Sequence, residues 1–223
     1  MPEPFDFAQK IALVAGGTGG LGAPIAAELR ARGCIVTTVS RSPISDTAHI
    51  SADLRSPDAI SAVMNSIVER HGGVDIVVNA MGVVAFGTVD ATSIDTIEEL
   101  FLTNTFAHIF LMKEALKCAR QGSVLVGISG VIAEQNLPGL ATYGASKVAV
   151  RSFNEALTRE ARRSGIRVID ARPPHTETGL SSRAIAGDPP KFPVGLDPTK
   201  VAQRIVRAIA DGETDLPSAA FAS

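Results

Sequence analysis

Residues 10–22 read KIALVAGGTGGLG, and this stretch decides the fold. Residues 10–15 form a short apolar run that predicts a buried strand. Glycines follow at once, and residues 21–32 then repeat apolar side chains at helical spacing up to Gly33. Glycines between a strand and a helix let the chain turn tightly and bring backbone N–H groups to a phosphate. In this context the turn predicts dinucleotide binding rather than a purely structural bend.

The rest of the chain alternates apolar strand patterns with helical ones. Strands are expected at residues 34–39, 74–79, 123–128 and 166–171, and helices at 59–70, 94–117, 142–164 and 199–211. This alternation is typical of a parallel sheet covered on both faces. We therefore expect an α/β fold, a Rossmann-type doubly wound parallel sheet of six or seven strands with helices on both faces. Residues 1–223 are expected to form a single domain, with 175–198 as a substrate loop.

Composition excludes several classes of protein. The 223 residues are 45% hydrophobic and 20% charged, which fits a soluble protein with a sizeable core. A net charge of −2 predicts no attraction to nucleic acid or to an anionic membrane. Cys34 and Cys118 lack metal-ligand spacing, so no metal site is expected. Residues 1–9 lack the pattern of a signal peptide, and we expect a cytoplasmic protein.

The end of the second strand bears on the choice of cofactor. Enzymes that use NAD place an acidic residue there to hold the ribose 2′-hydroxyl. Here the chain reads Ser40-Arg41-Ser42, and the first acid is Asp46. Because Arg41 can pair with a 2′-phosphate, with Ser40 as a hydroxyl donor, we expect NADP(H) rather than NAD(H).

Tyr143 and Lys147 stand four residues apart in the predicted long helix, so they share one helix face. A nearby ammonium stabilises phenolate, and we expect the pKa of Tyr143 to fall toward the range of a general acid/base. The spacing alone is common by chance and also fits a structural tyrosine at a helix start.

Taken together, the residues resemble the short-chain dehydrogenase/reductase family over nearly the whole chain. The cofactor turn corresponds to Gly16, Thr18, Gly19, Gly20, Leu21 and Gly22. The other cofactor-binding and catalytic positions that the resemblance implies are Asp53, Leu54, Asn79, Ala80, Met81, Gly82, Asn104, Tyr143, Lys147, Pro173 and Thr176 or Thr178. Ala80 and Met81 depart from the family's Asn-Asn-Ala-Gly, and Pro174 replaces a glycine. The chain also ends without the family's usual last strand, so that strand is expected to be short or absent.

The resemblance implies hydride transfer between a nicotinamide and a small carbonyl or alcohol substrate. Tyr143 then serves as general acid/base, Lys147 holds the ribose, and Asn104 supports a proton-relay water. Leu180, Ile185, Phe192, Leu196, Arg183 and Lys191 are expected to line the substrate site. The family's pairing of helices implies a homodimer or homotetramer through residues 105–117 and 142–164.

Gly130 is the serious departure from the family pattern. The family's substrate-orienting serine stands thirteen residues before the tyrosine, which here is Gly130, with Ser129 next to it. Either Ser129 turns inward through a bulge, Thr142 or His175 substitutes, the substrate supplies its own partner, or catalysis is weak. We take Ser129 as the candidate catalytic hydroxyl. A glycine here also suits a backbone with positive φ. The alternative function is a dinucleotide-binding regulatory or low-activity protein.

Overall fold

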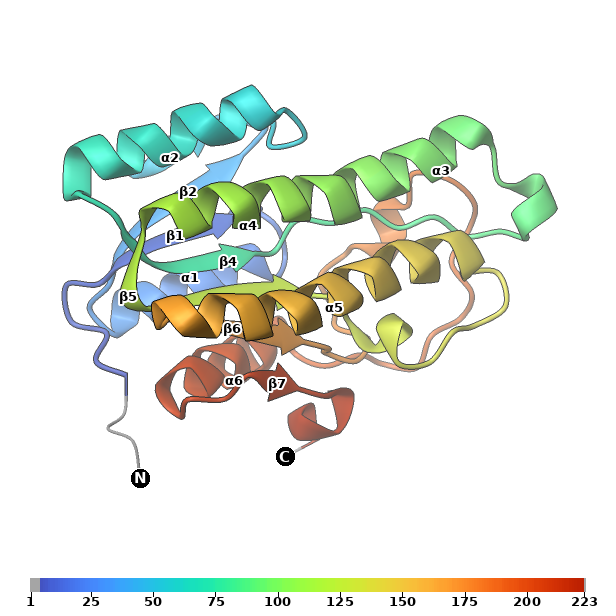
Figure 1. The fold of residues 1–223 in the computed structure, drawn as a ribbon. Helices are drawn as coiled ribbons and strands as arrows, with labels where there is room; N and C mark the ends of the chain where they lie inside the picture. Colours follow the sequence, from blue (N-terminus) through green and yellow to red (C-terminus); the bar gives the residue numbers. More distant parts are fainter. Residues whose placement is uncertain (1–4, 223) are drawn as a thin grey trace.

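The computed structural model describes residues 5–222 and contains a seven-stranded, fully parallel sheet (Figure 1). Its strands are β1 (Ile11–Ala15), β2 (Ile35–Ser40), β3 (His49–Ser51), β4 (Val74–Asn79), β5 (Ala119–Ile128), β6 (Arg167–Ala171) and β7 (Asp215–Leu216). They lie in the order β3-β2-β1-β4-β5-β6-β7. The helices are α1 (Gly22–Ala31), α2 (Pro57–His71), α3 (Ile94–Leu100), α4 (Ala107–Cys118), α5 (Ala141–Ala161) and α6 (Pro198–Ala210).

Helices cover both faces of the sheet (Figure 1). Alternate residues of β1 point to opposite faces, because strand side chains repeat every two residues. Ala12 and Val14 pack in a core with α1 and α6, whereas Leu13 and Ala15 pack in a second core with α2, α4 and α5. The predicted doubly wound parallel sheet is confirmed.

The sheet reverses its strand order between β1 and β4. From β1 the chain builds outward through β2 and β3, and it then crosses to β4 on the other side of β1. Ligands of open α/β sheets bind at such a reversal, beyond the carboxyl ends of the strands. The glycine turn after β1 and the segment after β4 both lie there.

Two elements differ from the sequence expectation, and the last strand agrees with it. β3 was not expected, because its three residues carry no strand pattern; His49 Nδ1 lies 3.0 Å from Thr38 Oγ1 on β2. The helical region at 94–117 is interrupted by a π-helical turn at Phe101–Phe106. β7 has two residues, which confirms the expectation of a short last strand.

The substrate loop, residues 175–198, contains one 3₁₀ turn at Ser181–Arg183. Isolated parallel bridges join Ala186 to Ala85 and Thr176 to Leu196. The first bridge holds the loop beside the segment that follows β4, and the second joins the two ends of the loop. Among residues 5–222, none of the helices combines the length and apolarity needed to cross a membrane.

Candidate active site

The glycine turn presents free backbone donors at the start of α1. Gly16 N and Gly17 N both donate to Val39 O at the end of β2, which fixes the turn against the sheet. Within residues 5–222, the N–H groups of Thr18, Gly20 and Leu21 donate to no protein group. Unpaired N–H groups at a helix N-terminus attract anions, so the turn suits the pyrophosphate of a dinucleotide.

Arg41 follows β2 and is exposed, and its guanidinium makes no ion pair in the described part of the chain. Ser40 is less available, because its hydroxyl donates to Ser42 O and contacts His49. The Asp53 carboxylate is held by Arg55, with Nη2 and Oδ2 2.6 Å apart, and this contact lowers the pKa of Asp53. Leu54 is buried in the core beneath.

The segment after β4 is tied to β1 and to the π turn. Ala80 N donates to Ala15 O, and the Asn79 side chain accepts from Met81 N at 3.0 Å. A Cβ on Gly82 would lie 3.4 Å from Asn104 Oδ1, so the chain passes close to that side chain. Ala80, Met81 and Gly82 therefore form one wall of the crevice beside the glycine turn, while Asn79 is buried beneath them.

Asn104 lies in the π-helical turn, a rare conformation that is frequent at functional sites. Its Oδ1 accepts from Val83 N at 2.9 Å, and its Nδ2 donates to Val83 O and to Ser146 Oγ, each at 3.0 Å. The Asn104 side chain thus joins the segment after β4 to α5 at Ser146, the residue before Lys147.

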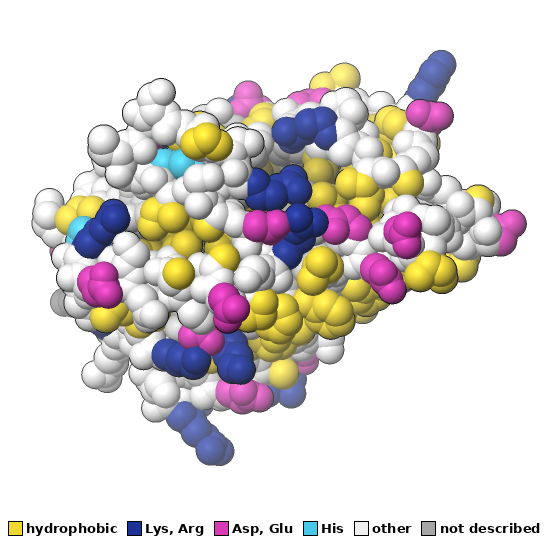
Figure 2. Space-filling model, turned by 90° about the horizontal axis from the view of Figure 1, so that it is seen from above, with side chains coloured by type: hydrophobic (Ala, Val, Ile, Leu, Met, Phe, Trp, Pro, Cys, Tyr) yellow, Lys and Arg dark blue, Asp and Glu magenta, His cyan; other side chains and the backbone are white. Residues whose placement is uncertain are grey.

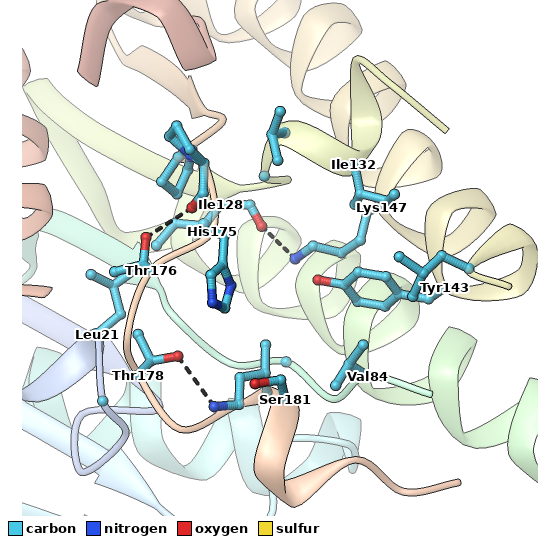
Figure 3. Close-up of a pocket in the computed structure, with 18 of the residues that line it drawn as sticks. Leu21, Val84, Ile128, Ile132, Tyr143, Lys147, His175, Thr176, Thr178 and Ser181 are labelled. Atoms are coloured by element: carbon cyan, nitrogen blue, oxygen red, sulfur yellow. Dashed lines mark hydrogen bonds between the residues drawn. The ribbon is translucent and has the colours of Figure 1, made fainter. Parts of the chain in front are cut away.

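Tyr143 and Lys147 lie on the cavity face of α5, with the phenol hydroxyl and the ammonium pointing to the same space (Figure 3). Lys147 Nζ donates to Ile128 O at 2.6 Å, which fixes the ammonium at the end of β5. An ammonium has three donors, so two stay available to a ligand. Tyr143 and Lys147 therefore lie together on one face of α5, as their four-residue spacing predicts.

The pKa of Tyr143 differs from the sequence expectation. Burial raises the pKa of Tyr143 to about 12, whereas we expected Lys147 to lower it. Burial also lowers the pKa of Lys147 to about 8, although Asp170 opposes this shift. At neutral pH the phenol therefore carries its proton, as a general acid requires, and most of the lysine is charged.

Ser129 is wrongly assigned as the catalytic hydroxyl. Its side chain is fully buried, and its Oγ donates to Asp170 Oδ2 at 2.9 Å on the side away from the cavity. Thr142 is not among the residues that line the cavity. Gly130 does line it, with φ +82° and ψ 164°, a conformation essentially restricted to glycine. Of the three side chains proposed as substitutes, only His175 reaches the cavity.

The cavity beside Tyr143 has mostly apolar walls. Among its lining residues are Val84, Phe86, Ile132, Leu140, Leu180 and Phe192. Of the loop residues expected there, Leu180, Arg183 and Phe192 line it, whereas Ile185, Lys191 and Leu196 do not. Val84, Phe86, Ile132 and Leu140 were missed, because they come from the segments that follow β4 and β5.

The substrate loop also covers the glycine turn. A Cβ on Gly20 would lie 2.3 Å from Thr178 O, so the loop backbone touches the turn. Arg183 holds this part of the loop by donating to Thr178 O and Gly179 O. Pro173 and Thr176 line the same space, and Thr176 Oγ1 donates to Pro174 O. In Figure 3, Leu21, Thr176 and Thr178 lie on one side of the cavity and Tyr143 on the other.

A buried polar network lies beneath the site and was not expected. Asn79 contacts His108 Nδ1 at 2.9 Å, His108 Nε2 contacts Asn154 at 2.7 Å, and Asn154 donates to Asp170 at 2.8 Å. Gly127 stands between Asn79 and Asp170 on the sheet. A Cβ there would lie 2.3 Å from Asn154 Nδ2, so the glycine makes room for the network.

No group of three metal-ligating side chains is present in residues 5–222. A doubly wound parallel sheet with a glycine turn at its reversal point is the architecture of dinucleotide-binding proteins. The family model described as short chain dehydrogenase matches residues 10–188. The chain therefore belongs to the short-chain dehydrogenase/reductase family.

Individual relatives support this family assignment. Hydroxynaphthalene reductase of Aspergillus fumigatus is 28% identical over 91% of this chain and 78% of the relative. Versicolorin reductase of Emericella nidulans is 31% identical over 77% of this chain and 70% of the relative. A short chain dehydrogenase from Burkholderia cenocepacia, solved in complex with NADP, shares the fold with a TM-score of 0.82; it is 24% identical, and the match covers 98% of this chain and 100% of that one.

Proposed function

We propose that this protein is an NADP(H)-dependent oxidoreductase that transfers hydride between nicotinamide and a carbonyl or alcohol substrate. The observation that carries the proposal is the pair of Tyr143 and Lys147, which opens on a cavity continuous with the glycine turn. The names of two relatives, hydroxynaphthalene reductase and versicolorin reductase, favour the reductive direction.

The residues present fit the cofactor. The free N–H groups of Thr18, Gly20 and Leu21 suit the pyrophosphate, and the two remaining Lys147 donors suit ribose hydroxyls. Asn79, Met81 and Gly82 would lie along the ribose, with Pro173 and Thr176 near the nicotinamide. Asp53 and Leu54 would lie at the adenine end, although Arg55 already holds the Asp53 carboxylate.

When bound, NADPH supplies the hydride that reduces the substrate carbonyl carbon. Tyr143 donates its proton to the carbonyl oxygen, and its raised pKa keeps that proton in place at neutral pH. Lys147, fixed by Ile128 O, stabilises the phenolate that remains until a proton returns. Asn104 holds the segment after β4 against α5 and so positions this pair.

Tyr143→Phe tests the catalytic assignment, because it removes only the transferable proton. We expect NADPH binding to persist in calorimetry and NADPH consumption with ketones, aldehydes and quinones to be abolished. A variant that retains most of the wild-type rate would contradict the assignment. The alternative, a dinucleotide-binding regulatory or low-activity protein, is favoured by Gly130; it predicts that the wild type binds NADPH but consumes none with the whole panel.

Arg41 is proposed to select NADP(H) by pairing with the 2′-phosphate. We expect Arg41→Ala to weaken NADPH binding by about 1.5–3 kcal/mol, the range for a charged hydrogen bond, and to leave NADH binding nearly unchanged. Arg70→Ala on α2 is the control, since Arg70 is exposed at the helix end. Equal affinity of the wild type for both cofactors in calorimetry would exclude this preference.

We also propose a homodimer or homotetramer that pairs α4 and α5 across two-fold axes. Figure 2 shows hydrophobic side chains gathered in the lower right part of the face seen from above. Phe106 and Val148, in the π turn and α5, are 47% and 37% exposed. The cytoplasmic location expected from the sequence stays a prediction.

A further inference from the structure

We propose that His175 replaces the missing serine as the hydrogen-bond donor to the substrate oxygen, and that the aromatic wall carrying it selects flat, aromatic carbonyl compounds. The inference rests on the proposed function, since it names the substrate class and an additional catalytic residue of the same site. Gly130 offers the cavity no side chain, and the Ser129 hydroxyl donates to Asp170 in the core.

His175 follows Pro173 and Pro174 at the carboxyl end of β6, and its imidazole stands in the cavity facing the Tyr143 hydroxyl (Figure 3). Its backbone is fixed, because Leu196 N donates to His175 O at 2.8 Å. Its ring stacks on Phe192 with centroids 4.8 Å apart and an interplanar angle of 27°. A Cβ on Gly195 would lie 2.8 Å from His175 Cδ2, so the backbone at Gly195 packs closely against the imidazole ring.

The ring is oriented but keeps hydrogen-bonding capacity for a ligand. Nε2 lies 3.5 Å from Glu177 Oε1, and that oxygen already accepts from Gly195 N at 2.7 Å. In the described part of the chain, Nδ1 has no hydrogen-bond partner. A fixed N–H donor aimed at the reacting oxygen is worth about 10²–10³-fold in rate, which is the contribution that Gly130 cannot make.

The wall beside His175 is aromatic: the imidazole stacks on Phe192, and the Phe86 ring is tilted by 50° against Phe192. Phe192 lies between His175 and Phe86, with the two phenyl centroids 6.1 Å apart. Val84, Ile132 and Leu140 complete the enclosure with aliphatic groups. Arg183 is a charged lining residue, and its Nε and Nη2 donate to Gly179 O and Thr178 O of its own loop. Stacked and edge-to-face contacts favour an aromatic ring over a saturated one of equal size.

Two ketones separate the contribution of the aromatic wall to substrate binding from the intrinsic reactivity of the carbonyl group. 2-Tetralone and trans-2-decalone share a bicyclic skeleton, and neither carbonyl is conjugated with a ring. We expect kcat/KM of the wild type to favour 2-tetralone by about tenfold, mainly through KM. Phe192→Leu should remove most of this preference. A wild type that reduces both ketones equally would overturn the aromatic class.

Two variants of His175 test the donor. His175→Phe keeps a ring to stack on Phe192 and removes the N–H, so kcat for 2-tetralone should fall about 10²-fold while the Kd of NADPH stays constant. His175→Gln restores an N–H donor and should recover part of kcat. Lys191→Ala is the control, since Lys191 is exposed on the same loop and does not line the cavity. A His175→Phe variant with normal kcat, or a Gln variant as impaired as Phe, would overturn the donor role.

The outcomes also distinguish this inference from the proposed function. If the wild type reduces other carbonyl compounds but not 2-tetralone, the function stands and the substrate class is wrong. If the wild type reduces none of the compounds, the binding of 1-naphthol in the presence of NADP⁺ is measured by calorimetry. Binding that Phe192→Leu weakens would support the aromatic site but not the reaction. No binding would overturn both the aromatic site and the proposed function.

Discussion

Gly130 holds a backbone conformation that serine adopts only under strain. With φ at +82°, a side chain costs about 1–3 kcal/mol, although the space around its Cβ is open, with Pro173 O 3.9 Å away. We therefore expect Gly130→Ser to lower the free energy of unfolding by about that amount in denaturant titration, without raising turnover. Gly130→Ala is the control, because it carries the same strain without a hydroxyl. A serine variant much faster than both alanine variant and wild type would show that the hydroxyl alone is missing.

Lys147 sets an alkaline limit on the reduction. Its pKa near 8 means that the ammonium loses its proton as the pH rises through 8, whereas Tyr143, with a pKa near 12, stays protonated. At saturating NADPH, kcat/KM should be level below pH 8 and fall about tenfold per pH unit above it. Ketone titration between pH 6 and 10 measures this limb. A profile that stays level to pH 10 would show that the charge of Lys147 is not required.

The sequence places individual side chains well where their partners are local. Tyr143 and Lys147 follow from a four-residue spacing, and the glycine turn follows from its position between a strand and a helix. Ser129 was wrongly assigned to the cavity because its hydroxyl is oriented by Asp170, which stands 41 residues away in the sequence. His108 and Asn154 form their contact over 46 residues, so no local pattern could reveal it.

At the scale of elements, Gly127 lets α4 and α5 place polar side chains against the sheet. A methyl group there would lie 2.3 Å from Asn154 Nδ2 and 2.7 Å from His108 Cε1. Overpacking of this kind costs about 1–3 kcal/mol, and broken hydrogen bonds add to it. We expect Gly127→Ala to lower the free energy of unfolding by at least that amount.

Asn154→Ala provides the check on this cause. If the clash with Asn154 dominates, Gly127→Ala together with Asn154→Ala costs less than the sum of the single changes, because the second change removes the obstacle. Strictly additive costs in denaturant titration would place the strain elsewhere in the structure.

The apolar strands and amphipathic helices were predictable because burial repeats with the period of each element. β3 has three residues and takes its stability from β2, so it carried no signal of its own. The π turn depends on Asn104 bonding across to Val83 and Ser146, which a helical repeat cannot indicate. The irregular path of residues 175–198 was recognised, but its contacts with Phe86 and Gly20 were not.

At the scale of the molecule, the exposed side of α4 and α5 predicts self-association. Phe106 is 47% exposed and stacks on the partly buried Phe110, with centroids 6.3 Å apart. Phe106→Glu would place a charge in the proposed interface, and we expect a lower mass in light scattering at micromolar concentration. Val68→Glu on α2, at 39% exposure, is the control and should leave the mass unchanged. A monomeric wild type would refute the interface.

The substrate loop contacts both binding regions at once, since Thr178 O rests on Gly20 while Leu180 and Ser181 line the cavity. A single segment that meets two ligands links their affinities thermodynamically, and such linkage is reciprocal. We expect 2-tetralol to tighten NADP⁺ binding by the same factor by which NADP⁺ tightens 2-tetralol, about 5-fold or more. Gly20→Ala, which displaces Thr178, should reduce this factor in calorimetry performed in both orders of addition. A factor of one in the wild type would mean that the two ligands bind independently despite sharing the loop.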